Sequence, residues 1–349
     1  MTDPVRSRRP ASDNPYRLPA YISGPAEEYA AFRSGAVLID RRARGRMLLA
    51  GEQARSMLTG LVTNDVVALG PSHGLYAAAL TLKGKIVADL RIYARQDALW
   101  LDVAPLAWEG WWSIVRKYIN PRLARYEDLT TAYATLGIYG PAAASSLAGV
   151  LGIGTSLLLD LAPYAHRPLD ADASSGFVAC IPDSGSNGFE IWVPADAFET
   201  WWRRVADGGV VPAGAVTADV IRVEAGRPEW GRDMDDTTLA QEANLDQHHA
   251  ISYTKGCYTG QETVARLHFR GHVNRHLRGL LLPDDSLPPP GSALATRDDK
   301  AIGDVRSVAL SPRLGGIALA MIRRDVEAGT RVLAGDSRIE GQVVDLPFV

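Results

Sequence analysis

The chain carries the octapeptide KGCYTGQE at residues 255–262, in which a lysine and a glycine precede a cysteine. Thr259 and Glu262 fit the capping-box pattern, which predicts a helix with Thr259 as its N-cap. A cysteine just before such a helix faces free backbone N–H groups and the positive end of the helix dipole, and Lys255 adds a full positive charge. Both influences favour the thiolate, the reactive form of cysteine. We therefore predict that Cys257 is a functional thiol supported by Lys255; the alternative is a small buried residue in a tight turn.

This octapeptide resembles the signature of the YgfZ folate-binding family, whose members are relatives of the glycine-cleavage aminomethyltransferase (T-protein) and support iron–sulfur proteins. Four other segments are similar to the same group of proteins, and the resemblance extends from about residue 27 to about residue 333. These segments are residues 63–66, 80–90, 219–246 and 311–320. The resemblance implies an α+β fold, with two ferredoxin-like halves and a C-terminal β-barrel arranged around a central channel that holds folate.

An internal repeat supports two similar halves independently of the resemblance. The apolar stretch at residues 99–103 is followed by a proline and by the tryptophan pair 111–112, and the stretch at 189–193 is followed by a proline and by the pair 201–202. The two tryptophan pairs are 90 residues apart (111 to 201), and each unit predicts a strand, a break and an amphipathic helix. We interpret the tryptophans as core anchors rather than as a ligand site.

Short strand patterns recur in the last quarter of the chain, which indicates a small barrel. They lie at residues 277–281, 305–310, 317–322 and 338–344. We expect a disordered basic lead-in at residues 1–20, a folate-binding domain at 21–271 and a barrel domain at 272–349.

Composition limits the classes of partner. The 349 residues are 46% hydrophobic and 22% charged with a net charge of −3, so we expect neither a nucleic-acid nor a membrane partner. Of the two cysteines, Cys180 lies in an apolar strand pattern and reads as core, and the low cysteine content favours a reducing compartment, so we expect a cytoplasmic protein. Two cysteines do not supply a four-thiolate cluster site. The resemblance to the YgfZ family implies folate and iron–sulfur client or assembly proteins as partners.

Glu224 is the predicted holder of the folate ring. A carboxylate can accept two N–H groups from the amino-pyrimidinone edge of a pterin, and the matching glutamate does this in the related aminomethyltransferases. The alternative is a structural glutamate at the junction of two elements. We assign Arg222, Tyr253 and Arg266 to the same site, where Arg266 belongs to a basic stretch that could receive the carboxylate tail of folate or form a solvated face.

Three further residues come from segments similar to the folate site. Asn64 and Asp65 read either as ligand contacts or as an Asx turn. In the aminomethyltransferases an acidic pair contributes the catalytic aspartate, and here that pair reads Ala88-Asp89. A shift of one residue would turn the Asp89 side chain to the other face of its strand, so its register decides whether it is catalytic.

No metal site is predicted. His268, His272 and His276 are spaced four residues apart, but Gly271 interrupts the helix that would align them. Three functions remain open. The first is a binder of tetrahydrofolate, or of a one-carbon folate derivative, that supports iron–sulfur cluster assembly or repair through Cys257. The second is a tetrahydrofolate-dependent aminomethyltransferase or demethylase that uses Asp89, and the third is a scaffold with the same fold and no ligand.

Overall fold

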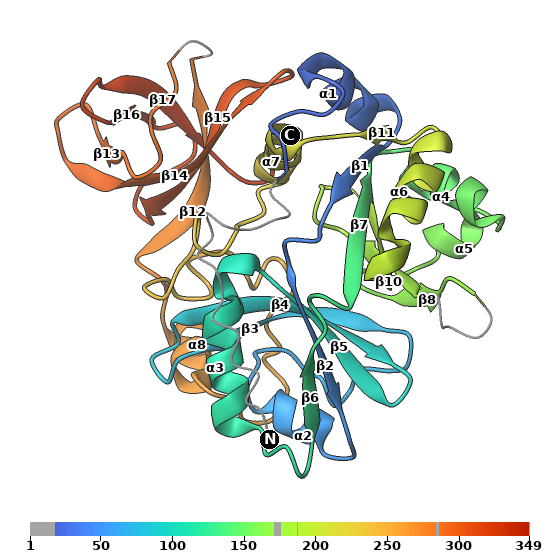
Figure 1. The fold of residues 1–349 in the computed structure, drawn as a ribbon. Helices are drawn as coiled ribbons and strands as arrows, with labels where there is room; N and C mark the ends of the chain where they lie inside the picture. The colour runs from blue at the N-terminus through green and yellow to red at the C-terminus, as the bar shows by residue number, and fades with distance from the viewer. Residues whose placement is uncertain (1–17, 171–175, 187, 284–285, 349) are drawn as a thin grey trace.

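The computed structural model describes residues 18–170, 176–186, 188–283 and 286–348. Most of the predicted basic lead-in, residues 1–17, lies outside the described residues. Two β-sheets with helices on their outer faces form one part of the molecule, and a closed β-barrel forms the other (Figure 1). This α+β architecture with a C-terminal barrel confirms the predicted fold class.

The first half is built on a five-stranded sheet in the order β3-β4-β5-β2-β6. An apolar core lies between its outer face and helices α2 and α3. The elements are β2 (Gly45–Ala50), α2 (Ala54–Thr59), β3 (Gly74–Leu80), β4 (Ile86–Arg95), β5 (Ala98–Val103), the 3-10 turn η2 (Pro105–Ala107), α3 (Trp108–Tyr118) and β6 (Arg125–Asp128).

The second half is built on a six-stranded sheet in the order β11-β1-β7-β10-β9-β8, covered on its outer face by α4 and α6. Strand β1 comes from the N-terminal part of the chain, so the two halves are interlocked rather than consecutive. The elements are β1 (Val37–Asp40), β7 (Tyr133–Tyr139), α4 (Ala143–Leu151), α5 (Ser156–Leu159), β8 (His166–Pro168), β9 (Phe177–Ile181), β10 (Gly188–Pro194), the 3-10 turn η3 (Ala195–Ala197), α6 (Phe198–Asp207) and β11 (Val211–Pro212).

The predicted repeat is present. Strand β5, η2 and α3 in the first half correspond to β10, η3 and α6 in the second. In each helix a pair of rings four residues apart stacks, Trp108 on Trp112 and Phe198 on Trp202, with ring centroids 5.5 and 5.7 Å apart. These rings pack in the cores outside the sheets, as expected for anchors of the fold.

The inner faces of the two sheets face each other, and the period of two along each strand sorts the side chains between the layers. On β4, Ala88, Leu90 and Ile92 pack toward the helices, whereas Asp89 and Arg91 line a cavity between the sheets. The register question for Asp89 is thereby answered: it is the inward residue of the Ala88-Asp89 pair.

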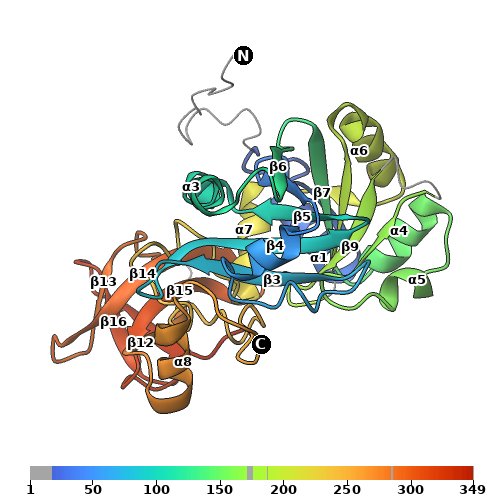
Figure 2. The same cartoon turned by 90° about the horizontal axis from the view of Figure 1, so that it is seen from below.

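The barrel closes in the order β12-β15-β14-β13-β16-β17 around its own apolar core. Helix α7 (Ala215–Glu224) contacts β14 and β15 of the barrel and also α1 (Pro25–Ser34), so it lies at the junction of the barrel and the sheets (Figures 1 and 2). The remaining elements are α8 (Gln261–Arg270), β12 (Arg275–Leu282), β13 (Ala293–Ala295), β14 (Ala301–Ser311), β15 (Gly315–Arg323), β16 (Arg331–Ala334) and β17 (Ile339–Val344). Across the described ranges, none of the helices combines the length and apolar character needed to cross a membrane.

Candidate functional site

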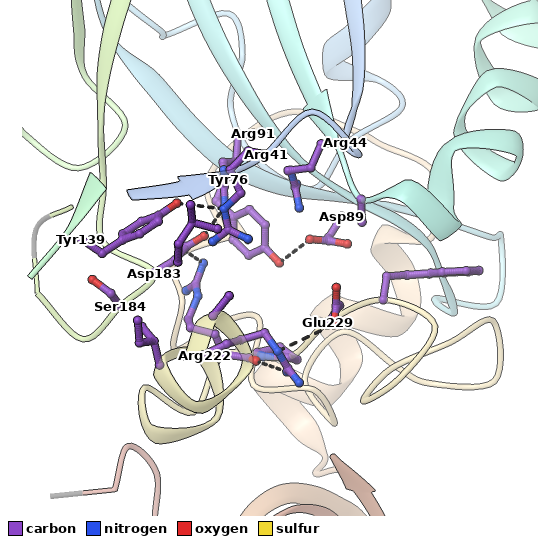
Figure 3. Close-up of a pocket in the computed structure, with 17 residues that line it drawn as sticks. Arg41, Arg44, Tyr76, Asp89, Arg91, Tyr139, Asp183, Ser184, Arg222 and Glu229 are labelled. Carbon is purple, nitrogen blue, oxygen red and sulfur yellow. Dashed lines mark hydrogen bonds and ion pairs between the residues drawn. The ribbon is translucent and has the colours of Figure 1, made fainter. Parts of the chain in front are cut away.

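A small cavity of about 70 Å³ lies where the inner faces of the two sheets meet α7 and the loop after it (Figure 3). Its lining is strongly charged. The charged residues are Arg41, Arg44, Asp89, Arg91, Asp183, Arg222, Arg227 and Glu229. Because charged side chains are rarely buried unless they are paired or functional, this cavity is the strongest candidate for a reactive site.

Asp89 is the acid of this cavity that keeps a free oxygen. It is 6% exposed, and its Oδ2 accepts a hydrogen bond of 3.0 Å from the Tyr76 hydroxyl. Its Oδ1 is buried and has no hydrogen-bond partner among the described residues. Burial raises the pKa of Asp89, and this outweighs the opposing influences of Arg44 and the Tyr76 hydroxyl. A buried carboxylate with one oxygen fixed and the other open is suited to accepting a proton or a polarised N–H group.

Arg91 is the centre of an ion network that joins the two sheets. It is 5% exposed, and its guanidinium donates to Asp102 (3.1 Å), Glu190 (2.9 Å) and Asp183 (2.5 Å). Asp102 lies on β5 and Glu190 on β10, so this one side chain pairs with acids from both halves. Burial alone would raise the pKa of Asp183, but Arg227 and Arg91 outweigh it and hold that pKa well below the ordinary value.

Arg41 and Arg44 follow β1 and enter the cavity from the sheet side (Figure 3). Each is paired through its Nε: Arg41 donates to the Tyr139 hydroxyl at 3.1 Å, and Arg44 donates to Asp102. Within the described part of the chain, the terminal amino groups of both arginines meet no hydrogen-bond acceptor. These groups are unused donors of the cavity, and so is the indole N–H of Trp230, which also lines it and has no partner among the described residues.

Arg222, predicted to bind folate, lines the opposite wall on α7, but its guanidinium is fully engaged. It donates to Asp219 (2.7 Å), Asp233 (2.5 Å) and the Ser307 hydroxyl of the barrel (2.8 Å). This arrangement makes Arg222 a link between α7, the following loop and β14 rather than a free ligand contact.

A larger cavity of about 580 Å³ adjoins the first one, and Tyr76 and Arg227 line both. Its walls include aromatic and apolar groups such as Tyr164 and Leu346, together with His248. Burial lowers the pKa of His248 to about 3, so the imidazole is neutral at physiological pH, and its Nε2 has no partner among the described residues. A cavity of this size and character falls within the range of about 300–1,000 Å³ that is typical of small-molecule sites.

Glu224, the predicted holder of the folate ring, is not among the residues that line the two cavities, although the next two residues, Ala225 and Gly226, line the larger one. Its Oε1 accepts hydrogen bonds from the hydroxyls of Tyr29 (2.6 Å) and Ser311 (2.5 Å) at the contact between α1, α7 and the barrel. Both donors lie on other elements, so the glutamate joins three parts of the fold. The structural alternative is the one that this geometry favours.

Asn64 and Asp65 form a turn that supports the wall of the cavities. The Asp65 carboxylate accepts the backbone N–H groups of Val67 and Ala68, which is an Asx-type arrangement. The Asn64 amide donates to the carbonyl oxygen of Tyr76 at 2.9 Å. Neither residue lines either of these two cavities, but Asn64 fixes the backbone of Tyr76, which lines both.

The octapeptide does not form the predicted capping box. Helix α8 begins at Gln261, and its N-cap is Gly260 with φ +84°, without a side-chain cap. A Cβ at Gly260 would lie 2.6 Å from the carbonyl oxygen of Thr81, so the close approach of this segment to the β3–β4 turn requires glycine. The N-cap of the helix is therefore Gly260, in the left-handed conformation, and not Thr259 as the sequence predicts.

Lys255 and Cys257 have different environments. Lys255 is 8% exposed, and its Nζ donates to the carbonyl oxygens of Thr59 (2.5 Å), Val62 (2.7 Å) and Asn64 (2.9 Å). The three N–H groups of this ammonium are therefore used by backbone carbonyl groups of residues 59–64, and the ammonium does not contact the cysteine thiol. Cys257 is exposed, so the alternative of a small buried residue does not hold, whereas Cys180 is buried in β9 and its burial raises its pKa to about 11.

Tyr253 and Arg266 lie outside both cavities. The Tyr253 ring stacks on His268 of α8 with centroids 3.6 Å apart, and Arg266 is exposed on the same helix. The structure thus brings Asp89 and Arg222 to one cavity and places the other predicted contacts around it or elsewhere.

Sequence reasoning missed Arg41, Arg44, Arg91, Asp183 and Glu190. A signal for two of them is present: Glu190 is the single charge in the otherwise apolar strand β10, and Arg91 lies two residues after Asp89 on β4, on the same inward face. An isolated charge in such a strand pattern is costly unless it is paired or functional.

Comparison with known proteins gives the family. Residues 12–253 match the family model of the GCVT N-terminal domain, and residues 275–349 match that of the glycine cleavage T-protein C-terminal barrel domain. An aminomethyltransferase of Nostoc sp. is 28% identical over 316 residues, which cover 88% of this chain and 82% of that protein. One of Rubrobacter xylanophilus is 29% identical over 336 residues, which cover 95% of this chain and 88% of that protein.

The solved structure of glycine cleavage system aminomethyltransferase T from Bartonella henselae superposes with a TM-score of 0.83. It is 22% identical and the match covers 93% of this chain and 89% of that one, so it shows a shared fold. With family models matched from residue 12 to residue 349 apart from 254–274, the chain belongs to the glycine cleavage T-protein family.

Proposed function

We propose that the chain is a tetrahydrofolate-dependent aminomethyltransferase or demethylase, in which Asp89 is the acid–base residue. Aminomethyltransferases of this family use tetrahydrofolate as the carrier of the one-carbon unit. The observation that carries the proposal is the free Oδ1 of Asp89, buried in a cavity beside a larger cavity of ligand size.

The larger cavity fits a folate better than the smaller one does. At about 580 Å³ it has room for a ring system and its substituents, whereas about 70 Å³ holds only a few atoms. Tyr76 and Tyr164 stack with ring centroids 6.2 Å apart in its wall, and such aromatic faces suit a flat heterocycle. In this proposal Tyr76, Tyr164 and His248 would hold the ring, and Tyr76 also lines the smaller cavity that contains Asp89.

Tetrahydrofolate, when bound, supplies the nitrogen nucleophile that receives the one-carbon unit. Asp89 holds the proton that this exchange moves, at Oδ1, while the Tyr76 hydroxyl keeps Oδ2 and hence the carboxylate plane in position. The raised pKa of Asp89 makes it a stronger base than an ordinary aspartate, which favours proton transfer near neutral pH.

Thermal unfolding with tetrahydrofolate tests the binding step. A ligand that binds the native state alone stabilises it by about 2.7 kcal/mol at a hundred times its Kd. We expect tetrahydrofolate to raise the Tm of the full chain, and Tyr164→Ala to reduce this shift. A Tm that does not move at saturating tetrahydrofolate would exclude the proposal.

We infer a second candidate, a YgfZ-type role in iron–sulfur cluster assembly or repair, from one observation. The Cys257 thiol is exposed, and Lys255, two residues earlier, fixes this segment to the protein by a hydrogen bond to the carbonyl oxygen of Thr59. Expression of the chain and of Cys257→Ala in cells that lack their own family member, with an iron–sulfur enzyme as readout, tests this role. If wild type restores the enzyme and Cys257→Ala does not, the thiol carries an iron–sulfur function. Equal rescue by both would leave the chemistry to Asp89.

A further inference from the structure

Arg227 lies at the boundary between the two cavities and lines both of them. Its place is set by the end of α7, where the helix stops at Glu224 and Gly226 adopts a left-handed conformation with φ +65°. The backbone N–H of Arg227 then donates to the carbonyl oxygen of Arg222 at 3.1 Å. The side chain therefore starts from a fixed point at the end of the helix, and the residue is buried.

The Arg227 guanidinium contacts three side chains. One terminal amino group lies 2.5 Å from Asp183 Oδ1 and donates to the Tyr164 hydroxyl at 3.1 Å. The guanidinium carbon lies over the Tyr76 ring, 5.0 Å from its centroid. That ring stacks on Tyr164, with 6.2 Å between centroids and 20° between planes. The Tyr76 ring is therefore held between an aromatic ring and a cation.

Asp183 does not need Arg227 to balance its charge. Arg91 already donates to the other oxygen of this carboxylate at 2.5 Å. A second buried guanidinium beside the same acid adds a desolvation cost, which further contacts must offset. Burial alone would lower the pKa of Arg227, but Asp183 outweighs it, so the guanidinium keeps its charge. A buried cation over an aromatic face gains such a contact, and here that face belongs to Tyr76.

The Tyr76 hydroxyl joins this group to Asp89 (Figure 3). It donates to Asp89 Oδ2 at 3.0 Å, and no other described residue hydrogen-bonds to the Asp89 side chain. Both side chains are buried between the sheets. A tilt of the Tyr76 ring would therefore displace the donor that fixes the plane of the Asp89 carboxylate.

We propose that Arg227 is a positioning residue for Asp89. Its guanidinium holds the Tyr76 ring against Tyr164, so that the Tyr76 hydroxyl keeps Asp89 Oδ2 fixed and leaves Oδ1 for proton transfer. This inference rests on the proposed function, in which Asp89 is the acid–base residue. It makes the turn after α7 part of the machinery that orients a side chain of β4.

Titration of the Asp89 carboxyl group reports this coupling. Burial raises its pKa, and Arg44, the Tyr76 hydroxyl and Arg91 act in the opposite direction. Loss of the bond from Tyr76 removes an influence that favours the carboxylate, so the titration midpoint should move to higher pH. Carbon NMR of the full chain with labelled aspartate carboxyl groups measures the midpoint, and Asp89→Asn assigns the signal.

The test is a double-mutant cycle of Arg227→Met and Tyr76→Phe. Each variant alone should move the Asp89 midpoint to higher pH. In the Tyr76→Phe background, Arg227→Met should add no further shift, because the hydroxyl through which Arg227 acts is absent. Arg227→Lys keeps a cation near the ring and should recover part of the wild-type midpoint. Arg232→Met removes an exposed charge of the same loop and is the matched control, for which we expect no shift.

The rate of one-carbon transfer to tetrahydrofolate should fall about ten- to a hundred-fold in Arg227→Met, since a displacement of about 1 Å is enough for such a loss. The Tm of each variant shows that it is folded. If Arg227→Met does not fold, Arg227→Lys takes its place in the cycle, with a smaller shift that should again vanish in the Tyr76→Phe background.

An unchanged Asp89 midpoint in the folded Arg227 variants would overturn the positioning role. Additive shifts in the cycle would also overturn it, because Arg227 would then act through its own charge and not through Tyr76. Saturating tetrahydrofolate should move the Asp89 signal of the wild type. If neither this signal nor the Tm responds to tetrahydrofolate, the proposed function fails, whereas the cycle still decides whether Arg227 positions Asp89.

Discussion

The two sheet-based halves of the molecule are alike on their outer faces and differ on the faces that meet. Outside the sheets, the strand, 3-10 turn and helix of each half carry a stacked ring pair at equivalent positions, Trp108 with Trp112 and Phe198 with Trp202. Inside, the equivalent strands β5 and β10 carry their tryptophan and their acid in opposite order.

The first ladder pairs Tyr93 with Trp100 and Arg91 with Asp102. In the second ladder, Trp192 occupies the position equivalent to Asp102 and is paired with Phe177. Glu190 occupies the position equivalent to Trp100. This alignment follows from the repeat, because Trp100 and Asp102 shifted by 90 residues fall on Glu190 and Trp192. The rings of both halves therefore meet one another, and the acids of both halves meet Arg91.

The difference divides the space between the sheets into two zones. In the aromatic zone, Trp100 contacts Phe177 and Trp192 with centroids 5.8 and 6.0 Å apart. In the charged zone, Arg91 bonds to Glu190 across the gap and to Asp102 in its own sheet. The two halves thus share the packing pattern on their outer faces. On their inner faces the pattern is inverted, and this inversion separates the aromatic zone from the charged zone.

The largest expected effect is on catalysis in the charged zone, from Asp89→Asn. We expect the rate of one-carbon transfer to fall by about 10²–10⁴-fold, the range for loss of an acid–base group. The exposed Asp97, in the β4–β5 turn, provides the matched control, and Asp97→Asn should leave the rate unchanged. Steady-state kinetics with tetrahydrofolate measure both.

The pH profile of the same variant separates catalysis from folding. The folded pKa of Asp89 is raised, so the base is lost as pH falls through that pKa, and the acidic limb of the rate profile should disappear in Asp89→Asn. For stability the sign is opposite: a raised folded pKa favours the folded state below the ordinary value near 3.9, and this advantage is lost as pH rises. Asp89→Asn should therefore have a Tm at pH 7 no lower than wild type, and a clear drop in Tm would show that Asp89 is structural.

The next largest effect is on stability, from Arg91→Met in the same zone. It leaves the buried acids Asp102 and Glu190 without the cation that pairs with both, which costs about 3–5 kcal/mol for a broken buried pair. Urea unfolding measures the free energy of unfolding, with Arg125→Met on the exposed strand β6 as control at about 0.5 kcal/mol or less. A loss below about 1 kcal/mol for Arg91→Met would mean that the charged zone does not hold the halves together.

The sequence was sufficient for the architecture but for less of the site, and the reason is the range of the interactions. Strand period, proline breaks and the repeat are local patterns, and they predicted β5, β10, α3, α6 and four of the six barrel strands to within a few residues; the short strands β13 and β16 were not predicted. The resemblance supplied Asp89, and strand alternation alone left two registers open for it. The facing of the two sheets, a long-range contact, decided between them.

The contacts of Glu224 and of the octapeptide, which the sequence did not predict, have the same origin. A glutamate that accepts from Tyr29 and Ser311, 195 and 87 residues away in the sequence, looks like any acid at the end of a helix until those elements are placed. Likewise, the capping-box pattern of Thr259 competes with a demand from the β3–β4 turn, whose Thr81 carbonyl excludes any side chain at Gly260. Local propensity lost to tertiary contact in both places.

A smaller effect is expected in the aromatic zone, where Trp100 and Trp192 meet edge to face at 6.0 Å and 81°. A double-mutant cycle of Trp100→Leu and Trp192→Leu should give a coupling free energy of about 0.5–1.5 kcal/mol, the range for aromatic pairs. Urea unfolding of the two single variants and the double variant measures it. Strict additivity would show that the aromatic zone stabilises the fold only through the burial of each ring, without a favourable pairwise contact between the halves.

The smallest expected coupling is between the outer rings, which look the most alike. Trp112 and Trp202 are both half-buried and stack within their own helices, in separate cores on opposite sides of the two sheets. Trp112→Leu and Trp202→Leu should therefore destabilise by similar amounts and add to within about 0.3–0.5 kcal/mol in the double variant, because they share no partner. Coupling as large as that of Trp100 with Trp192 would mean that the outer layers also communicate through the sheets, and the division into independent outer cores and one shared inner seam would fail. Additive outer rings beside coupled inner rings would instead show that the halves were joined by changes on their inner faces alone.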